Sequence, residues 1–504
     1  MNQLKVGAIL NYFIIALNTI VGLAYTPYML RCLGQNEYGL YSLVASVIAY
    51  LTILDFGFGN AIVRYTAKFR AEGKMQEQWE MFGMFLIVYC IIGLIAFGGG
   101  LGLYYNADVL FDRTMTESDL SQARTMMLLL TINLAFTFPL SIFGSIITAY
   151  ENFVFQRIVN ILRIILSTGV LIIVLAIGYK AVALVIVQTV FNLLTLVINY
   201  IYCKRKLKIR ISFGRFNLPF IKEISIYSFW IFLNAIMDKI YWGTGQFVLG
   251  AVSGTIAVAI FSVAILLQQM YMAFSFSISN VLLPKITKMI ASNASNVEIS
   301  NLFIKAGRIQ CYIITFILMG FLLFGKSFII LWAGKDYEQS YYITVIFFIS
   351  MYTPLIQNTA LVILQARNQM KVRTLIYFSL SIVCIFLQII LSQSYGVYGC
   401  AIALGTVFLI GPGIIINVYY DKKQRLNIPL FWKNILSIIR IPILISVIFY
   451  FILQIFNIEF NSINLTLSIF IFSILFLSST IFTSLNKYER WLLLSSFRKQ
   501  NKHL

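Results

Sequence analysis

The sequence predicts an all-α polytopic membrane protein with about fourteen transmembrane helices. Two parallel six-helix repeats would form lobes around a central cavity, followed by two C-terminal helices. Hydrophobic residues make up 60% of the 504 residues and charged residues only 11%, whereas a soluble domain carries about a quarter charged residues. Apolar runs of about 20 residues, long enough to cross a ~30 Å hydrocarbon core as a helix, recur along the chain.

The apolar runs define the predicted helices in order. The first run is too long for the core of a signal peptide and no small-residue cleavage site follows it, so we expect a retained helix. The fourteen runs cover approximately 6–30, 40–63, 81–105, 125–149, 158–178, 181–203, 224–249, 255–283, 309–332, 341–364, 374–394, 398–420, 435–455 and 463–484.

The basic residues predict the orientation. With the N-terminus inside, the cytoplasmic segments carry 29 of the 38 Lys and Arg residues, whereas the opposite side carries six. Such a bias is typical of cytoplasmic loops. The formal charge of +20 is therefore explained by topology and by attraction to anionic lipid, and no nucleic-acid partner is expected. Both termini would be cytoplasmic, in the inner membrane of a bacterial cell.

An internal repeat predicts the domain organisation. Shifting the chain by 220 residues aligns 38–69 with 258–289, and pairs Gly34 with Gly254. A shift of 218 residues aligns 178–204 with 396–422, and pairs Gly178 with Gly396. Six helices separate the copies, so both lobes face the same way, and a site is expected between them. The predicted parts are an N-lobe at 1–203, a cytoplasmic linker at 204–223, a C-lobe at 224–420 and an appendage with a basic tail at 421–504.

Several kinds of chemistry have no support in the sequence. The single histidine is His503 in the terminal tail, and the six cysteines are scattered without a CxxC pair. No P-loop or HExxH pattern occurs. We therefore expect neither an enzyme nor a bound cofactor, although a proton or a monovalent cation is a candidate coupling ion.

Charged residues inside the seventh run point to a functional face. Asp238 and Lys239 lie about fourteen residues into it, roughly 21 Å from its cytoplasmic end at ~1.5 Å per residue. A charge at this depth costs about 2.5–3.5 kcal/mol on insertion scales. Helical spacing gives one face suited to a hydrated cavity, formed by Asn234, Asp238, Tyr241, Trp242 and Gly245. The alternative is that Asp238 and Lys239 bridge structurally to neighbouring helices.

Other polar residues in or near the spans are weaker candidates. Asn18 belongs to a polar stripe on the first run that either lines the cavity or packs between helices. Asp55 would reach Arg64 only through a bend, and otherwise binds a coupling ion or makes a stabilising polar contact. Arg31 lies at the outer mouth, with a loop role as the alternative. Arg163 either binds an anionic group in the cavity or extends to the cytoplasmic surface.

Several motifs together resemble a known family. The stretch 28–69, YMLRCLGQNEYGLYSLVASVIAYLTILDFGFGNAIVRYTAKF, combines an RxLG loop, an ExGLY helix entry and a DxGxxxAxxRY ending. With DKIYWGTG (238–245), VLLPKITKM (281–289) and ILQARNQMKVR (363–373), it resembles the polysaccharide-biosynthesis or oligosaccharide-unit flippases of the multidrug/oligosaccharidyl-lipid/polysaccharide exporter superfamily. The resemblance covers about residues 1–430. Tyr241, Trp242 and Gln246 depart from the aliphatic stretch usual in the seventh helix of that family.

The resemblance implies a function. Such a protein would move a polyprenyl-diphosphate-linked oligosaccharide from the inner to the outer leaflet by alternating access, for surface polysaccharides such as O-antigen. A glycan polymerase and other assembly proteins are candidate partners, alongside membrane lipids. A cation- or proton-coupled multidrug antiporter has the same fold and remains the alternative. A membrane glycan polymerase would need a large external loop, whereas the longest external segment here is about 106–124.

Overall fold

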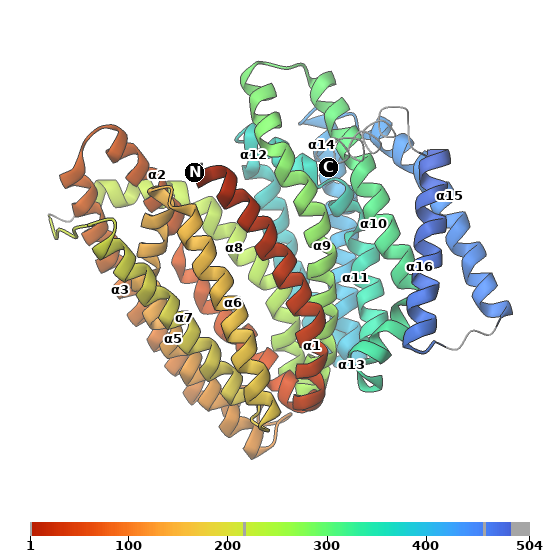
Figure 1. Ribbon diagram of the computed structural model, residues 1–504, viewed down its shortest axis with the longest axis horizontal. Helices are drawn as coiled ribbons and strands as arrows, with labels where there is room; N and C mark the ends of the chain where they lie inside the picture. Colours follow the sequence, from red (N-terminus) through yellow and green to blue (C-terminus); the bar gives the residue numbers. More distant parts are fainter. Residues whose placement is uncertain (1–2, 215–217, 457–459, 485–504) are drawn as a thin grey trace, which may run out of the picture. The chain divides into compact units, whose positions relative to one another are not determined.

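The computed structural model describes residues 3–214, 218–456 and 460–484, and these contain helices but no strand. The predicted basic tail, His503 and part of the predicted linker lie outside the described residues. The helices, shown in Figure 1, are α1 (Gln3–Ala49), η1 (Tyr50–Asp55), α2 (Phe58–Ala71), α3 (Met75–Tyr105), α4 (Ala107–Phe111), α5 (Glu117–Ala149), α6 (Phe153–Ala176), α7 (Ala181–Arg205), α8 (Leu218–Val252), α9 (Gly254–Ala291), α10 (Asn296–Trp332), η2 (Lys335–Tyr337), α11 (Gln339–Ile356), α12 (Asn358–Ala366), α13 (Met370–Ile410), η3 (Gly411–Ile415), α14 (Ile416–Lys422), α15 (Ile428–Ile455), α16 (Ser462–Ser479) and η4 (Thr480–Ser484).

The prediction of a polytopic helical membrane protein is confirmed. Within the described residues, ten helical segments are long and apolar enough to cross a membrane, and the pair Lys335–Ile356 and Asn358–Ala366, bent by 41°, makes an eleventh. Two of the ten segments, Phe13–Ala71 and Met370–Lys422, are 59 and 53 residues long. A crossing takes about 20 residues, so each of these segments is long enough for the two runs predicted in it. The count of fourteen stays a prediction.

Residues with positive φ reproduce the offset of the sequence repeat. Of the thirteen such residues in the described chain, ten form pairs that are 217 to 220 positions apart. Most of them lie where one helix ends and the next begins, so the two halves of the chain change direction at equivalent points. The pairs are Gly34 and Gly254, Gly73 and Asn293, Glu151 and Asn368, Gly178 and Gly396, and Lys208 and Arg425.

One helix break belongs to the first half only. Phe56 and Gly57 have φ of 52° and 71°, and they separate the 3₁₀ turn η1 from α2. The sequence repeat aligns Phe56 with Phe276, which lies inside the unbroken helix α9. The continuous helix predicted over 40–63 is therefore wrong at this point, because the backbone turns after Asp55.

The chain divides into two compact units, the first formed by Met1–Ser262 and Tyr377–Cys400. In this unit α3, α5 and α7 pack in a row, and α6 packs against α7 and α1 (Figure 1). α8 packs against α1, η1 and α2. Close packing requires glycine at two contacts: a Cβ on Gly39 would lie 1.9 Å from the Thr255 carbonyl oxygen, and one on Gly250 would lie 2.6 Å from Leu43.

The second unit comprises Val263–Ile376 and Ala401–Leu504. Its helix α10 packs against α11, α15 and α16 (Figure 1). Aromatic side chains from three helices form the contact, with Phe324 of α10 within ring-centroid distances of 5.9 Å of Phe449 and 5.8 Å of Phe472. Phe476 completes this buried cluster. The two C-terminal helices are therefore an integral part of this unit.

Three basic residues predicted on the outer side have carboxylate partners. Lys180 pairs with Glu37 at 3.6 Å, and Lys326 pairs with Glu338 at 2.8 Å. Arg124 pairs with Asp108. Glu37 also accepts a hydrogen bond from the backbone amide of Ala181, which starts α7. These pairs neutralise three of the six basic residues predicted on that side.

Candidate functional site

The helical backbone of the first unit breaks after Asp55. Irregular backbone at membrane depth is tolerated only inside the protein or beside a water-filled cavity, because hydrocarbon cannot satisfy free peptide groups. Here Asp55 supplies one solution, since its carboxylate accepts a hydrogen bond from the amide of Gly57. The motif DxGxxxAxxRY thus has a local explanation: Asp55 accepts at the break, Gly57 adopts positive φ and Ala61 is fully buried.

A tyrosine from α3 completes the environment of Asp55. The hydroxyl of Tyr89 donates to Oδ1 of Asp55 at 2.9 Å, and the Tyr89 side chain is fully buried. Its ring packs against Phe58 and Phe138 at centroid distances of 6.3 and 6.5 Å. The bend that the sequence required for an Asp55–Arg64 contact does exist, but the carboxylate is bound by Tyr89 and Gly57 instead. Nothing in the sequence distinguished Tyr89, because it is one of 29 tyrosines.

α8 packs directly against the break. The hydroxyls of Tyr50 in η1 and Thr244 in α8 lie 2.6 Å apart. Phe56 stacks on Phe232 with ring centroids 4.6 Å apart. A Cβ on Gly243 would lie 3.4 Å from the Tyr50 ring. Three charged residues of the first unit therefore lie on two neighbouring elements: Asp55 ends η1, and Asp238 and Lys239 lie on α8.

The polar face predicted on α8 is divided in two by the packing. Asn234, Lys239 and Trp242 are partly exposed and Asp238 is exposed. The Asn234 amide donates to the Trp230 carbonyl oxygen at 2.7 Å.

Two residues predicted on the same face belong to the packed side of α8. Tyr241 is 4% exposed and its hydroxyl donates to the Tyr377 carbonyl oxygen at 2.7 Å. A Cβ on Gly245 would lie 2.6 Å from the Phe261 ring. For Tyr241 and Gly245 the predicted face was too wide, because α8 has neighbours on that side. The accessible edge is narrower and consists of Asn234, Asp238, Lys239 and Trp242.

The other predicted site residues lie on different elements. Asn18 and Arg31 are exposed on the part of α1 before Gly34, and Arg163 is half-buried on α6. These two helices pack together, with a Cβ on Gly7 only 2.8 Å from Phe153. Arg64 is exposed on α2, 5.8 Å from the centroid of the Tyr65 ring. The described contacts thus form two groups, one on α1 and α6 and the other on η1 and α8.

A side-chain amide contact accounts for Gln246, one of the polar residues that interrupt the aliphatic stretch of the seventh predicted helix. Gln246 donates to the Ser262 hydroxyl at 2.8 Å and so joins α8 to α9. Nearby, Gln388 is fully buried and its two amide atoms have no hydrogen-bond partner among the described residues. Buried amides without partners are commonly satisfied by ordered water. Polar groups are therefore buried in this unit as well as exposed along its edge.

The geometry defines a membrane protein with a broken helix beside a helix that carries accessible charge. Discontinuous helices are typical of transporter binding sites, and charges inside membrane-spanning segments are rare unless they face water or a partner. Among the described residues, no group of three or more His, Cys, Asp and Glu side chains is placed to hold a metal ion. Fold and site together are those of a membrane transporter.

The family is shown by the sequence match. The family described as polysaccharide biosynthesis protein matches residues 4–290, which is more than half of the chain, and the protein belongs to this family. A region of 101 residues is 29% identical to a protein named "Putative O-antigen transporter" from Salmonella typhimurium (strain LT2). That region is 19% of this chain and covers only 24% of the relative's length.

Solved structures share the fold. The lipid II flippase MurJ in an inward closed conformation is similar with a TM-score of 0.71 and 18% identity, over 94% of this chain and 98% of that protein. An inward-facing multidrug resistance transporter of the MATE family, from the MOP superfamily, gives a TM-score of 0.61 at 13% identity, over 82% of this chain and 99% of the other. At these identities the likeness concerns the fold alone.

Proposed function

We propose that the protein is a flippase that moves polyprenyl-diphosphate-linked oligosaccharide units from the inner to the outer leaflet of a bacterial cytoplasmic membrane. The units would serve the synthesis of a surface polysaccharide such as O-antigen. The single observation that carries the proposal is membership of the polysaccharide biosynthesis family over residues 4–290. The match to an O-antigen transporter and the fold shared with a lipid II flippase support it.

The chemistry of such a substrate agrees with the residues on α8. A polyprenyl tail is able to stay in lipid, whereas the diphosphate and the sugars need a hydrated path with hydrogen-bonding groups. Lys239 would contribute positive charge for the diphosphate. Trp242, Asn234 and Asp238 would contribute a ring face, an amide and a carboxylate for the sugars, and Asn18, Arg31, Arg64 and Arg163 would act along the route as secondary polar contacts. The proposed mechanism is alternating access of two lobes.

The coupling ion belongs to the proposal as well. A proton or a monovalent cation would drive the cycle, and Asp55 or Asp238 would be its site. Glycan polymerase and other assembly proteins would receive the flipped units. If Asp55 binds the ion, replacement of its carboxylate by an amide should abolish transport. If its role is purely structural, the amide should be tolerated, so the variant Asp55→Asn separates the two roles.

Complementation tests the proposal. Variants Lys239→Ala and Asp238→Asn would be expressed in cells that lack the native protein, and lipid-linked sugar units would be quantified on the two membrane faces. We expect the units to accumulate on the inner face and surface glycan to fall. Matched controls are Lys335→Ala and Asp112→Asn, which remove the same groups from exposed positions outside the predicted spans.

Two outcomes would contradict these assignments at different levels. With normal amounts of protein in the membrane, full surface glycan in both α8 variants would contradict the assignment of α8 as the substrate face. Normal glycan in cells that lack the protein altogether would contradict the flippase function itself.

A multidrug antiporter is the second candidate, since the fold is shared with a multidrug resistance transporter. Deletion would then increase sensitivity to cationic drugs and leave surface glycan unchanged. The same deletion strain therefore separates the two functions.

A further inference from the structure

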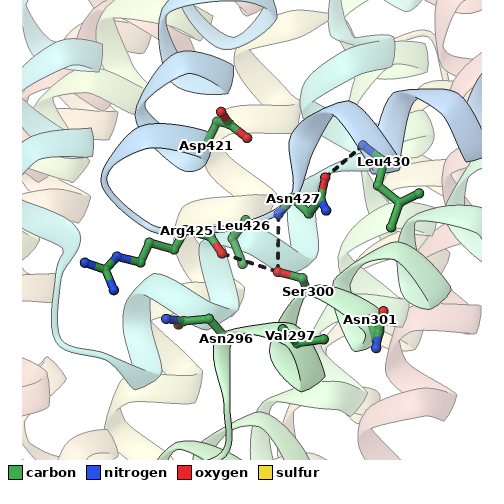
Figure 2. A pocket seen from close by; sticks show the side chains of 9 residues that line it. All are labelled: Asn296, Val297, Ser300, Asn301, Asp421, Arg425, Leu426, Asn427 and Leu430. Atoms are coloured by element: carbon green, nitrogen blue, oxygen red, sulfur yellow. Dashed lines mark hydrogen bonds between the residues drawn. The ribbon is translucent and has the colours of Figure 1, made fainter.

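The second unit carries a polar pocket of about 300 Å³ where α10 and α15 begin and α14 ends. The basic residues of the sequence assign this side to the cytoplasm. Figure 2 shows Asp421 and Asn301 at opposite edges of the pocket, with Ser300 and Asn427 between them. None of the residues that line this pocket belongs to the candidate site on η1 and α8.

The frame of the pocket is satisfied by internal hydrogen bonds. The Ser300 hydroxyl accepts from the amide of Asn427 at 3.2 Å and donates to the Arg425 carbonyl oxygen at 3.4 Å. Oδ1 of Asn427 caps α15 by accepting from the amide of Leu430 at 3.0 Å. Oδ1 of Asp421 accepts from the amide of Ile428 at 3.3 Å. The start of α15 therefore already has its partners and is not itself a vacant anion site.

A half-buried arginine holds the other wall. Arg367 donates through Nη1 to the Gln424 carbonyl oxygen at 2.7 Å and through Nη2 to Oδ1 of Asn296 at 2.8 Å. This interaction fixes the Asn296 amide so that its Nδ2 group is oriented away from the arginine. The wall is thus preorganised, which reduces the entropy lost on binding.

The groups left over for a ligand are mixed in character. In the described residues no hydrogen bond engages Nδ2 of Asn296, Nδ2 of Asn427 or the side-chain amide of Asn301, and Asp421 keeps one oxygen. Two apolar side chains adjoin them, Val297 at 69% and Leu430 at 40% exposure. Donors, acceptors and apolar surface thus surround one small space.

This mixture discriminates between classes of ligand. A phosphate uses only donors and would be repelled by the Asp421 carboxylate. A cation would leave the three side-chain amide donors unused. A sugar hydroxyl both donates and accepts, and the C–H face of a sugar ring is able to cover Val297 and Leu430. A neutral polyhydroxylated ring is therefore the ligand that uses all of the groups.

We propose that this pocket is a cytoplasmic docking site for a sugar residue of the lipid-linked substrate, occupied before translocation. The inference rests on the proposed flippase function. A shallow pocket suffices because the polyprenyl tail confines the headgroup to the membrane surface, which raises its effective concentration to about the millimolar range. The pocket thus collects headgroups that are already tethered nearby.

Binding of simple glycosides tests the pocket directly. Full-length protein in a sugar-free amphipol would be examined by saturation-transfer difference NMR with methyl glycosides of glucose, galactose, mannose and N-acetylglucosamine. We expect transfer to at least one of them in the wild type and none in Val297→Trp, where indole fills the pocket. The variant Asn301→Ala leaves the Asn427 helix cap in place and should bind about threefold to tenfold more weakly, because one hydrogen bond is lost.

The control is Val109→Trp, the same substitution at a position that is 84% exposed on α4. Glycoside signals that are equal in the wild type and Val297→Trp would overturn the inference, as would saturable binding of inorganic pyrophosphate in place of any glycoside. If the wild-type protein flips lipid-linked units in cells while no glycoside binds, only the docking site fails. If glycosides bind and lipid-linked units cross the membrane equally well without the protein, only the flippase function fails.

Discussion

The hydroxyl of Tyr89 on α3 lies 2.9 Å from Oδ1 of Asp55 and donates a hydrogen bond to it. Asp55 is the last residue of η1, and the amide of Gly57 donates to the same carboxylate. One acidic side chain thus anchors the broken helix to α3 and satisfies a peptide group at the break. These two hydrogen bonds stabilise the segment against which α8 packs.

Substitution of Asp55 separates a structural role from a charge-dependent one. Asn keeps an acceptor oxygen for Tyr89 and Gly57, whereas Ala leaves a buried hydroxyl and a peptide group without a partner, which costs about 1–3 kcal/mol. We expect Asp55→Asn to retain both the unfolding temperature and surface glycan, and Asp55→Ala to lower both. Thermal unfolding of purified protein and glycan staining of cells measure the two effects.

The outcome for Asp55→Asn decides the role of the charge. A normally folded Asp55→Asn protein without flipping activity would show that transport requires the carboxylate itself, as an ion-binding role predicts. Glu80 offers a control because its carboxylate accepts an exposed hydrogen bond from Gln76 within α3. The variant Glu80→Gln should change neither the unfolding temperature nor the amount of surface glycan.

The turn at Gly34 should depend on glycine for conformational reasons alone. Its φ is 73° and ψ is 174°, a region that is essentially restricted to glycine, and no atom lies within 4 Å of the position that a Cβ would take there. Gly34→Ala is therefore expected to cost about 1–3 kcal/mol through backbone strain. A lowered unfolding temperature in detergent would report this cost.

Gly102 provides the comparison for Gly34. It is helical and exposed on α3, and it also has free space around a Cβ. Gly102→Ala should leave stability unchanged or raise it by about 0.5–1 kcal/mol, since alanine favours the helix. Equal unfolding temperatures for Gly34→Ala and Gly102→Ala would disprove the conformational explanation.

The aromatic cluster of the second unit should depend strongly on Phe472. This ring is 1% exposed and packs against Phe449 and Phe324. Phe472→Ala is expected to cost about 3–5 kcal/mol because it leaves a cavity. Phe470 on the same helix is 62% exposed, and Phe470→Ala should have less than about 0.5 kcal/mol of effect. Thermal unfolding that affects both variants equally would show that α16 is not held by this cluster.

The repeat was predictable because it depends on local geometry. Glycine allows positive φ at little cost, and the two glycine pairs that the sequence repeat aligned, 34 with 254 and 178 with 396, have positive φ at all four positions. Lys208 and Arg425 form a further pair with positive φ, which the sequence alone did not indicate, because neither residue type favours this conformation.

The candidate site was only partly predictable. Asp238 and Lys239 were found because charge is conspicuous in an apolar helix. Tyr89 was not found, because the sequence does not show which residue a tyrosine hydroxyl will contact. The exposed and packed sides of α8 were also indistinguishable in the sequence, since Tyr241 and Trp242 are both amphipathic aromatic residues.

The sequence by itself determined the membrane-spanning class, the apolar runs and the aligned repeat segments, because these follow from residue hydrophobicity and from the spacing of matching residues. Only the tertiary structure decided the break at Asp55 and its partner Tyr89, the narrow accessible edge of α8 and the polar pocket at Ser300 and Asn427. Each of these depends on which side chains from distant parts of the chain are brought into contact. Helical periodicity places a residue on a face, but it does not say what that face meets.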